Sequence, residues 1–171
     1  MSTNKRVFWA CTAVSFCTHG VVLTAGPTGV GCYVAYGVQS VGITTNFNLE
    51  QVFELGQIAI YENVEEVPDI EVTIEKVLDG EPLLYDLASV VGLGADVNMV
   101  TQAQDQVDLW MTIQDETTDQ VESKGTHVYC SGMYVSSFSY TLPNEGNCTE
   151  SLTLVGNDKL WKESPAPDAR M

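Results

Sequence analysis

Basic residues are scarce in this chain. Its 171 residues include 23 acids and only 7 lysines and arginines, which gives a formal net charge of −16. A protein that binds nucleic acid or an anionic membrane surface needs a basic footprint against the phosphates, so this balance argues against both classes. An acidic wall past which a polyanion moves without adhering is still compatible with it. The apolar content is ordinary, and the length is sufficient for one domain with a good core.

Groups for catalysis are also few. His19 and His127 are the only histidines, and neither lies in a nucleophile or metal motif. The segment GPTGVG lacks the lysine and hydroxyl residue of a phosphate-binding loop. Carboxylate pairs are expected by chance among so many acids, so a hydrolase that uses two of them is a weak alternative. The sequence therefore predicts a protein that is not an enzyme and holds no cofactor or metal.

The chain has five cysteines, at positions 11, 17, 32, 130 and 148. Their odd number and the absence of a close CxxC spacing favour buried free thiols in a reducing compartment over a disulfide framework. No two of the cysteines and histidines have the spacing of a zinc finger.

Long hydrophobic runs are absent. Lys5 and Arg6 precede VFWACTAVSFC, which looks like a secretory signal, but Thr12 and Ser15 interrupt the run and no cleavage site follows. The run is also too short to span a bilayer. We expect residues 1–37 to form an N-terminal arm with strands, including a hairpin between 21–25 and 30–36, and we expect no membrane partner.

Alternating patterns indicate strands. In residues 70–75, Ile70, Val72 and Ile74 alternate with polar residues, which is typical of a strand with one apolar face. Similar patterns predict strands over 39–47, 107–113, 128–142 and 149–155. After the strand at 70–75, Leu78-Asp79-Gly80 predicts a turn. Pro82 and the leucines that follow it predict one short helix. A polar C-terminal tail is expected over 162–171.

Acidic residues are concentrated in one block. Residues 50–86 hold eleven acids and one base, Lys76, whereas residues 1–49 hold no acid. Such a block is either a solvated face or a surface that pairs with a neighbouring subunit. Within it, 48–69 is a long connection that is both acidic and rich in apolar residues. A long ordered connection of this kind is usually functional, and its apolar residues need burial in this core or in another copy of the chain.

Four segments carry a more specific pattern. They are QSVGITTNFNLEQVFELGQ (39–57), VPDIEVTIEKVLDG (67–80), PLLYDLA (82–88) and SFSYTLPNEGNCTESLTLVGNDKLW (137–161). Together, in this order, they resemble the tail tube (major tail) proteins of tailed bacteriophages. Type VI secretion tubes, pyocin tubes and tube-initiating baseplate proteins share a similar architecture.

The resemblance implies a mainly β, antiparallel sandwich or half-barrel with one flanking short helix. Six copies would join their edge strands into a ring around a large β-barrel lumen, and stacked rings would form the tube for genome ejection. Tail sheath, tail terminator and baseplate proteins are the further partners it implies. Viral DNA would pass through the lumen without specific binding. The protein would be assembled in the bacterial host cytoplasm and would end in the virion tail.

Two sets of residues follow as candidate sites. Apolar residues should face the core, so we expect Glu71 and Glu75 to face the lumen. We expect contacts between subunits from the 48–69 connection, at Phe53, Glu54, Tyr61, Glu62, Glu65 and Glu66. The alternatives from the residues alone are a monomeric β-sandwich module that binds a ligand such as carbohydrate, and the carboxylate-dependent hydrolase.

Overall fold

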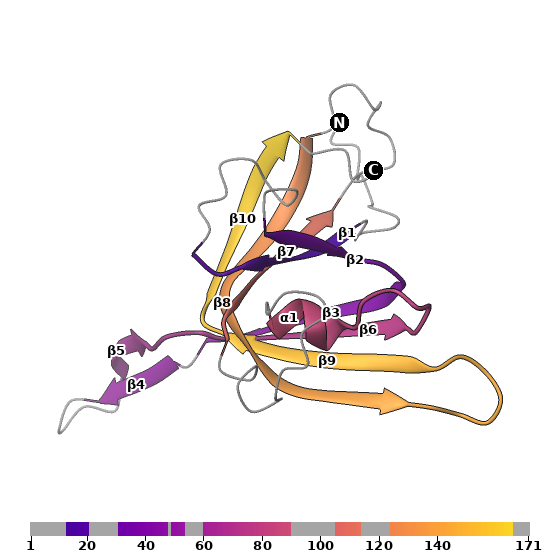
Figure 1. Ribbon diagram of the computed structural model, residues 1–171. Helices are drawn as coiled ribbons and strands as arrows, with labels where there is room; N and C mark the ends of the chain where they lie inside the picture. The colour runs from indigo at the N-terminus through magenta and orange to yellow at the C-terminus, as the bar shows by residue number, and fades with distance from the viewer. Residues whose placement is uncertain are drawn as a thin grey trace, which may run out of the picture.

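The computed structural model describes residues 13–20, 31–47, 49–53, 60–89, 105–113 and 124–165. They form ten strands and one helix (Figure 1). In chain order these are β1 (Ala13–Thr18), β2 (Cys32–Ala35), β3 (Val38–Asn46), β4 (Leu49–Phe53), β5 (Ile60–Glu65), β6 (Asp69–Val77), α1 (Leu84–Ser89), β7 (Val107–Ile113), β8 (Lys124–Thr141), β9 (Thr149–Gly156) and β10 (Asp158–Pro165).

Eight of the strands form one antiparallel sheet that folds into two layers. Its order is β2-β1-β7-β8-β9-β6-β3, with β10 paired to β8. The first half of β8 pairs with β7 and β10, and its second half pairs with β9. We call β2-β1-β7-β8-β10 the upper sheet and β8-β9-β6-β3 the lower sheet, as they lie in Figure 1. Strands β4 and β5 form a separate two-stranded sheet that projects from the body. The predicted mainly β, antiparallel class with one short helix is confirmed.

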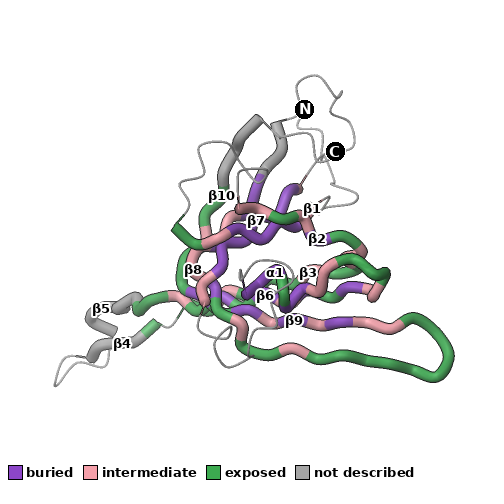
Figure 2. Tube along the Cα trace, in the orientation of Figure 1, coloured by how far each residue is buried: buried purple, intermediate pink, exposed green. Residues whose placement is uncertain are grey.

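The hydrophobic core lies between the two sheets, and α1 is buried beside it (Figure 2). Strand β6 shows why the sequence folds this way, because its apolar residues are buried and its acidic ones exposed in strict alternation. Large apolar side chains that are fully buried come from both sheets and from the helix: Phe16, Ile74, Leu84, Leu109, Met111, Met133, Leu152 and Leu154. Replacing one of them by alanine, such as Leu152, is expected to lower the free energy of unfolding by about 2–5 kcal/mol.

A bend in β8 lets one strand serve both sheets. Gly132 lies at the bend with a φ of +63°, a conformation that L side chains rarely adopt. The Gly132 N–H donates to Asp108 Oδ1 over 2.9 Å, which ties the bend to β7. Close by, a Cβ at Gly156 would collide with Met133 Sδ, so a larger residue there would require the Met133 side chain to move. These contacts fix where the upper sheet ends and the lower sheet begins.

A buried polar cluster holds α1 against the lower sheet. Glu150 on β9 is fully buried, and its carboxylate accepts from the backbone N–H groups of Leu84 (2.8 Å) and Tyr85 (3.1 Å) at the start of the helix. The Tyr140 hydroxyl donates to the same carboxylate over 3.1 Å. Burial and the Glu150 charge raise the pKa of Tyr140. Lys76, the cross-strand partner of Glu150, is also buried and donates to the Pro82 carbonyl over 2.8 Å. The helix is therefore capped by a residue far away in sequence.

The structure differs from the sequence expectations at several places. The predicted strands over 39–47, 107–113, 128–142 and 149–155 are present, with β8 starting earlier. Strand β10 was not predicted, and it takes up residues 158–165, including the start of the expected tail. Within the 48–69 connection, β4 and β5 form a hairpin. In the N-terminal arm, β2 pairs with β1. The predicted hairpin partner of this strand, residues 21–25, lies outside the described residues.

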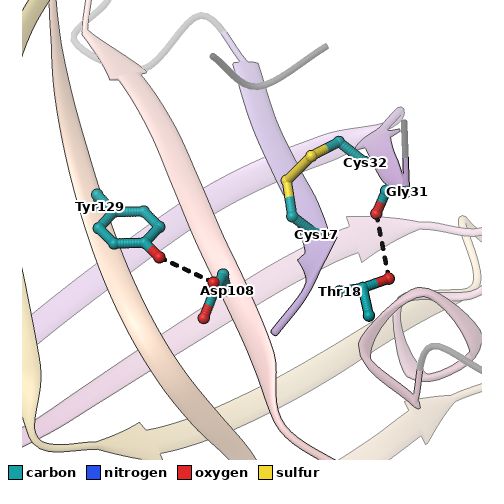
Figure 3. Close-up of a disulfide and its surroundings, with 6 residues drawn as sticks. All are labelled: Cys17, Thr18, Gly31, Cys32, Asp108 and Tyr129. Atoms are coloured by element: carbon teal, nitrogen blue, oxygen red, sulfur yellow. Dashed lines mark hydrogen bonds between the residues drawn. A yellow bond between two sulfur atoms is a disulfide. The ribbon is translucent and has the colours of Figure 1, made fainter. Parts of the chain in front are cut away.

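The expectation of free cysteines is wrong for one pair. Cys17 on β1 and Cys32 on β2 are cross-strand partners and form a disulfide (Figure 3). Their sequence separation of 15 residues has no motif-like spacing, so composition alone did not reveal the pairing. Cys130 is free and buried, Cys148 is free and half-buried, and Cys11 lies outside the described residues. Burial raises the pKa of the Cys130 thiol to about 11.

Candidate functional site

The outward face of the lower sheet is mostly polar. Cross-strand register places its residues in three rows that run over all four strands. We call these twelve positions the polar face: Ser40-Glu75-Ser151-Ser139, Gly42-Thr73-Thr153-Ser137 and Thr44-Glu71-Val155-Tyr134. Eight of the twelve are serine, threonine or glycine, so the face is smooth and able to hydrogen-bond. None of the twelve is basic.

Glu71 and Glu75 supply the charge of the polar face. Both are exposed on β6, while Ile70, Val72 and Ile74 are buried in the core. The Ser40 hydroxyl donates to Glu75 Oε2 over 2.8 Å, which orients that carboxylate along its row. Isolated carboxylates among hydroxyls repel a polyanion and offer no general acid–base pair. The polar face therefore carries negative charge and no positive charge at its twelve positions.

The lower sheet ends in two unpaired edges. Among the described strands, β3 pairs only with β6, and the second half of β8 pairs only with β9. Exposed edges recruit another strand, and a monomer normally blunts them with charge, proline or a covering segment. Here β3 carries no charged residue along its nine positions. The two edges are therefore suited to pairing between copies of the chain.

The β4–β5 hairpin carries the predicted contact residues. Phe53 lies on β4, Tyr61, Glu62 and Glu65 lie on β5, and Glu66 is exposed just after it. Glu54 lies outside the described residues. An isolated two-stranded hairpin is only marginally stable in water, so we expect this hairpin to pack against another protein surface. Exposed apolar residues surround its base, namely Phe47, Leu49 and Val67. The hairpin and its base form a second candidate assembly surface.

Asp108 organises a separate polar cluster on the upper sheet. It is 2% exposed, and its carboxylate accepts from Tyr129 (2.8 Å, Figure 3), Ser131 (3.2 Å) and the Gly132 N–H, and pairs with His19 Nδ1 (2.8 Å). Burial raises the pKa of Asp108, but the bonds from His19, Gly132 and Tyr129 outweigh it and hold the pKa below its usual value. Since these contacts join Asp108 on β7 to residues at the β8 bend and to His19, we interpret the cluster as structural. The sequence did not single out Asp108, because the residues that bind it come from two distant segments, His19 after β1 and residues 129–132 of β8.

Neither a membrane helix nor a metal cluster is found in the described part of the chain. None of its helices is long and apolar enough to cross a bilayer. Within the same residues, no group of three or more histidine, cysteine or acidic side chains could hold a metal ion.

A lower sheet with two edges that are unpaired among the described strands, a polar face with two glutamates and a projecting hairpin fit a subunit of a self-assembling β-tube. The Phi812 tail tube protein family matches residues 29–138, well over half of the chain, and the chain belongs to this family. It is a structural subunit of a tail tube and a component of the virion tail. The resemblance inferred from the sequence is thereby confirmed. Among curated protein sequences, none matches the chain.

Solved structures agree on the fold. The SPP1 tail tube is 11% identical, with a TM-score of 0.54 over 94% of this chain and 81% of that one. A chain of the anti-feeding prophage (AFP) baseplate is 12% identical, with a TM-score of 0.62 over 95% and 98%. A chain of an extracellular contractile injection system sheath–tube complex (PVC, extended state) is 9% identical, with a TM-score of 0.53 over 94% of both.

Proposed function

We propose that six copies of this chain close into a ring through their lower sheets. The β3 edge of one copy pairs with the second half of β8 in the next, which removes every free edge of the lower sheet. The observation that carries this proposal is that both edges are unpaired among the described strands and lie at opposite sides of one four-stranded sheet. The six-fold symmetrised AFP baseplate contains a chain of the same fold, which supports the number six.

The polar face lines the lumen in this arrangement. With strands about 4.8 Å apart, six such sheets close a barrel roughly 40 Å across between backbones, which leaves room for duplex DNA after the side chains. Each copy contributes Glu71 and Glu75, so every ring presents carboxylates around the whole circumference. Their field reaches about 8 Å at physiological salt, which is enough to keep phosphates from adhering to the wall. The lumen conducts the genome and has no catalytic task.

Stacked rings extend the channel along the tail. The β4–β5 hairpin reaches out of its own subunit and contacts another, with Phe53, Glu54, Tyr61, Glu62, Glu65 and Glu66 in the contact. Baseplate and terminator proteins close the two ends, and in a contractile tail a sheath surrounds the tube. Neighbours of the same fold occur in an AFP baseplate, an AFP tube-terminating cap and a sheath–tube complex, which supports these partners. Assembly takes place in the host cytoplasm.

Assembly is tested with the purified chain. Negative-stain images at high concentration should show rings or hollow tubes, and a cryo-EM map should place β6 on the inner wall. A monodisperse 18.6 kDa species at every concentration would contradict the proposal.

The lumen assignment is tested by reversing its charge. The double variant Glu71→Lys, Glu75→Lys should form tubes of normal length but slow genome ejection from phage that carry it, because lysines attract phosphates. Raising the salt concentration should partly restore the rate. Glu145→Lys, on the exposed turn between β8 and β9, is the matched control and should eject normally. Normal ejection at low salt by the double variant would show that the polar face is not the channel wall.

A further inference from the structure

We propose that the free edge of β10 is the surface on which the β4–β5 hairpin of a second copy docks. This inference rests on the proposed function, in which the hairpin contacts another subunit, and it names the surface that receives it. Ring closure uses the β3 and β8 edges of the lower sheet. Among the described strands, two edges of the upper sheet then remain, β2 and β10.

The occupant cannot be the hairpin of the same copy. Within one chain β4 and β5 pair only with each other among the described strands. In Figure 1 the hairpin leaves the corner where β9 passes into β10 and projects outward, while β10 rises away from that corner. The two elements diverge from a common point, so a hairpin seated along β10 comes from a different copy.

Of the two remaining edges, β10 offers a larger and more apolar surface than β2. Trp161 is 64% exposed and Leu160 is 45% exposed, although both lie in the middle of a paired strand. Successive residues of a strand point to opposite faces, so a strand added beside β10 would cover part of each. An exposed tryptophan of this kind is a typical centre of a protein interface. By contrast β2 has four residues, too few to match hairpin strands of five and six residues.

Charge favours the same pairing. Residues 48–66 carry five acids and no base. The ribbon formed by β10 and the first half of β8 carries three of the chain's seven bases, Lys124, Lys159 and Lys162, against Asp158 and Glu163. This ribbon therefore has one base in excess in its composition, on a protein with a net charge of −16. An acidic hairpin meets less repulsion there than on the acidic polar face.

Photo-crosslinking in assembled tubes tests the docking directly. p-Benzoylphenylalanine replaces Trp161 in one preparation and Tyr33, the 43% exposed aromatic residue of the β2 edge, in a matched control. Tubes grown from a mixture of light and ¹⁵N-labelled chains report whether a crosslink joins two copies. Position 161 should crosslink to residues 49–65 of a second copy, and position 33 should not. Crosslinks to 49–65 from position 33 instead, or from neither position, overturn the inference.

A substitution measures how much the contact contributes. Trp161→Ala should raise the critical concentration for tube assembly roughly tenfold, as loss of a buried interface tryptophan does. Tyr33→Ala should leave it unchanged, and both variants should keep the wild-type melting temperature because both side chains are exposed. Tubes that form at the wild-type concentration with Trp161→Ala contradict the docking but not ring assembly. Failure of the wild-type chain to form tubes contradicts the proposed function and the docking together.

Discussion

Glu150→Ala is expected to be among the most destabilising single substitutions in this chain. The wild-type carboxylate is fully buried and accepts three hydrogen bonds, two from the first N–H groups of α1 and one from the Tyr140 hydroxyl. Alanine leaves three buried donors without this acceptor, and each such loss costs about 1–3 kcal/mol. The buried Lys76, which is the cross-strand partner of Glu150, keeps its ion pair with Asp79 (3.4 Å) in this variant. We expect a loss of about 4 kcal/mol in the free energy of unfolding.

That loss is a large part of the stability of an ordinary domain, which is about 5–15 kcal/mol. Urea denaturation should show a lower midpoint with an unchanged slope, and the melting temperature should fall by roughly 10 °C. Glu150→Gln keeps the shape and one acceptor oxygen, so its cost should be about half. The control Glu145→Ala removes an exposed acid near the same strand and should change stability by no more than about 0.5 kcal/mol. If Glu150→Ala costs less than about 1 kcal/mol, the carboxylate does not cap α1, and the reasoning from buried donors fails.

Three further predictions concern other parts of the molecule. Replacing Cys17 and Cys32 by serine should lower stability by about 3 kcal/mol under oxidising conditions, since the disulfide closes a loop of about 15 residues, and reductant should produce the same loss in the wild type alone. Stability should fall on acidification, because burial lowers the pKa of His127 below 6.5 and hydrogen bonding lowers that of Asp108 below 3.8. At low pH the unfolded chain then binds more protons than the folded chain, so the loss of stability begins below about pH 6.5 and deepens below about pH 4. In a plot of the urea midpoint against pH, Asp108→Asn should reduce the fall below about pH 4. Replacing 49–65 by a short Gly-Ser link should leave a folded monomer with an unchanged melting temperature but should shorten or abolish tubes in electron micrographs.

The parts of the fold that depend on local pattern were predictable from the sequence. Alternation fixed the faces of β6, because a one-residue shift would bury Glu71 and Glu75 and expose their apolar neighbours. The short helix after Pro82 was also predictable from proline and leucine placement, although it begins at Leu84. Both predictions use only residues a few positions apart.

The parts that depend on distant residues were not predictable. Strand β10 contains two lysines, an aspartate and a glutamate, so no alternation signals it, and it exists because it pairs with β8. The Cys17–Cys32 bond required knowledge that β1 and β2 are neighbours. The polar face illustrates both limits, since the acids on β6 were found by pattern, whereas the serine and threonine rows beside them emerge only from cross-strand register.

Strand β8 has a mechanical consequence for any tube built from this chain. It runs without interruption through 18 residues and belongs to both sheets, with its bend tied to β7 through Asp108. A load on the lower layer therefore passes along a covalent backbone into the upper layer, and the two layers deform as one body. Each subunit is therefore stiff, and the tube deforms mainly at the seams, which are the interfaces between subunits. When such a tube curves, its seams open and close while each subunit keeps its shape.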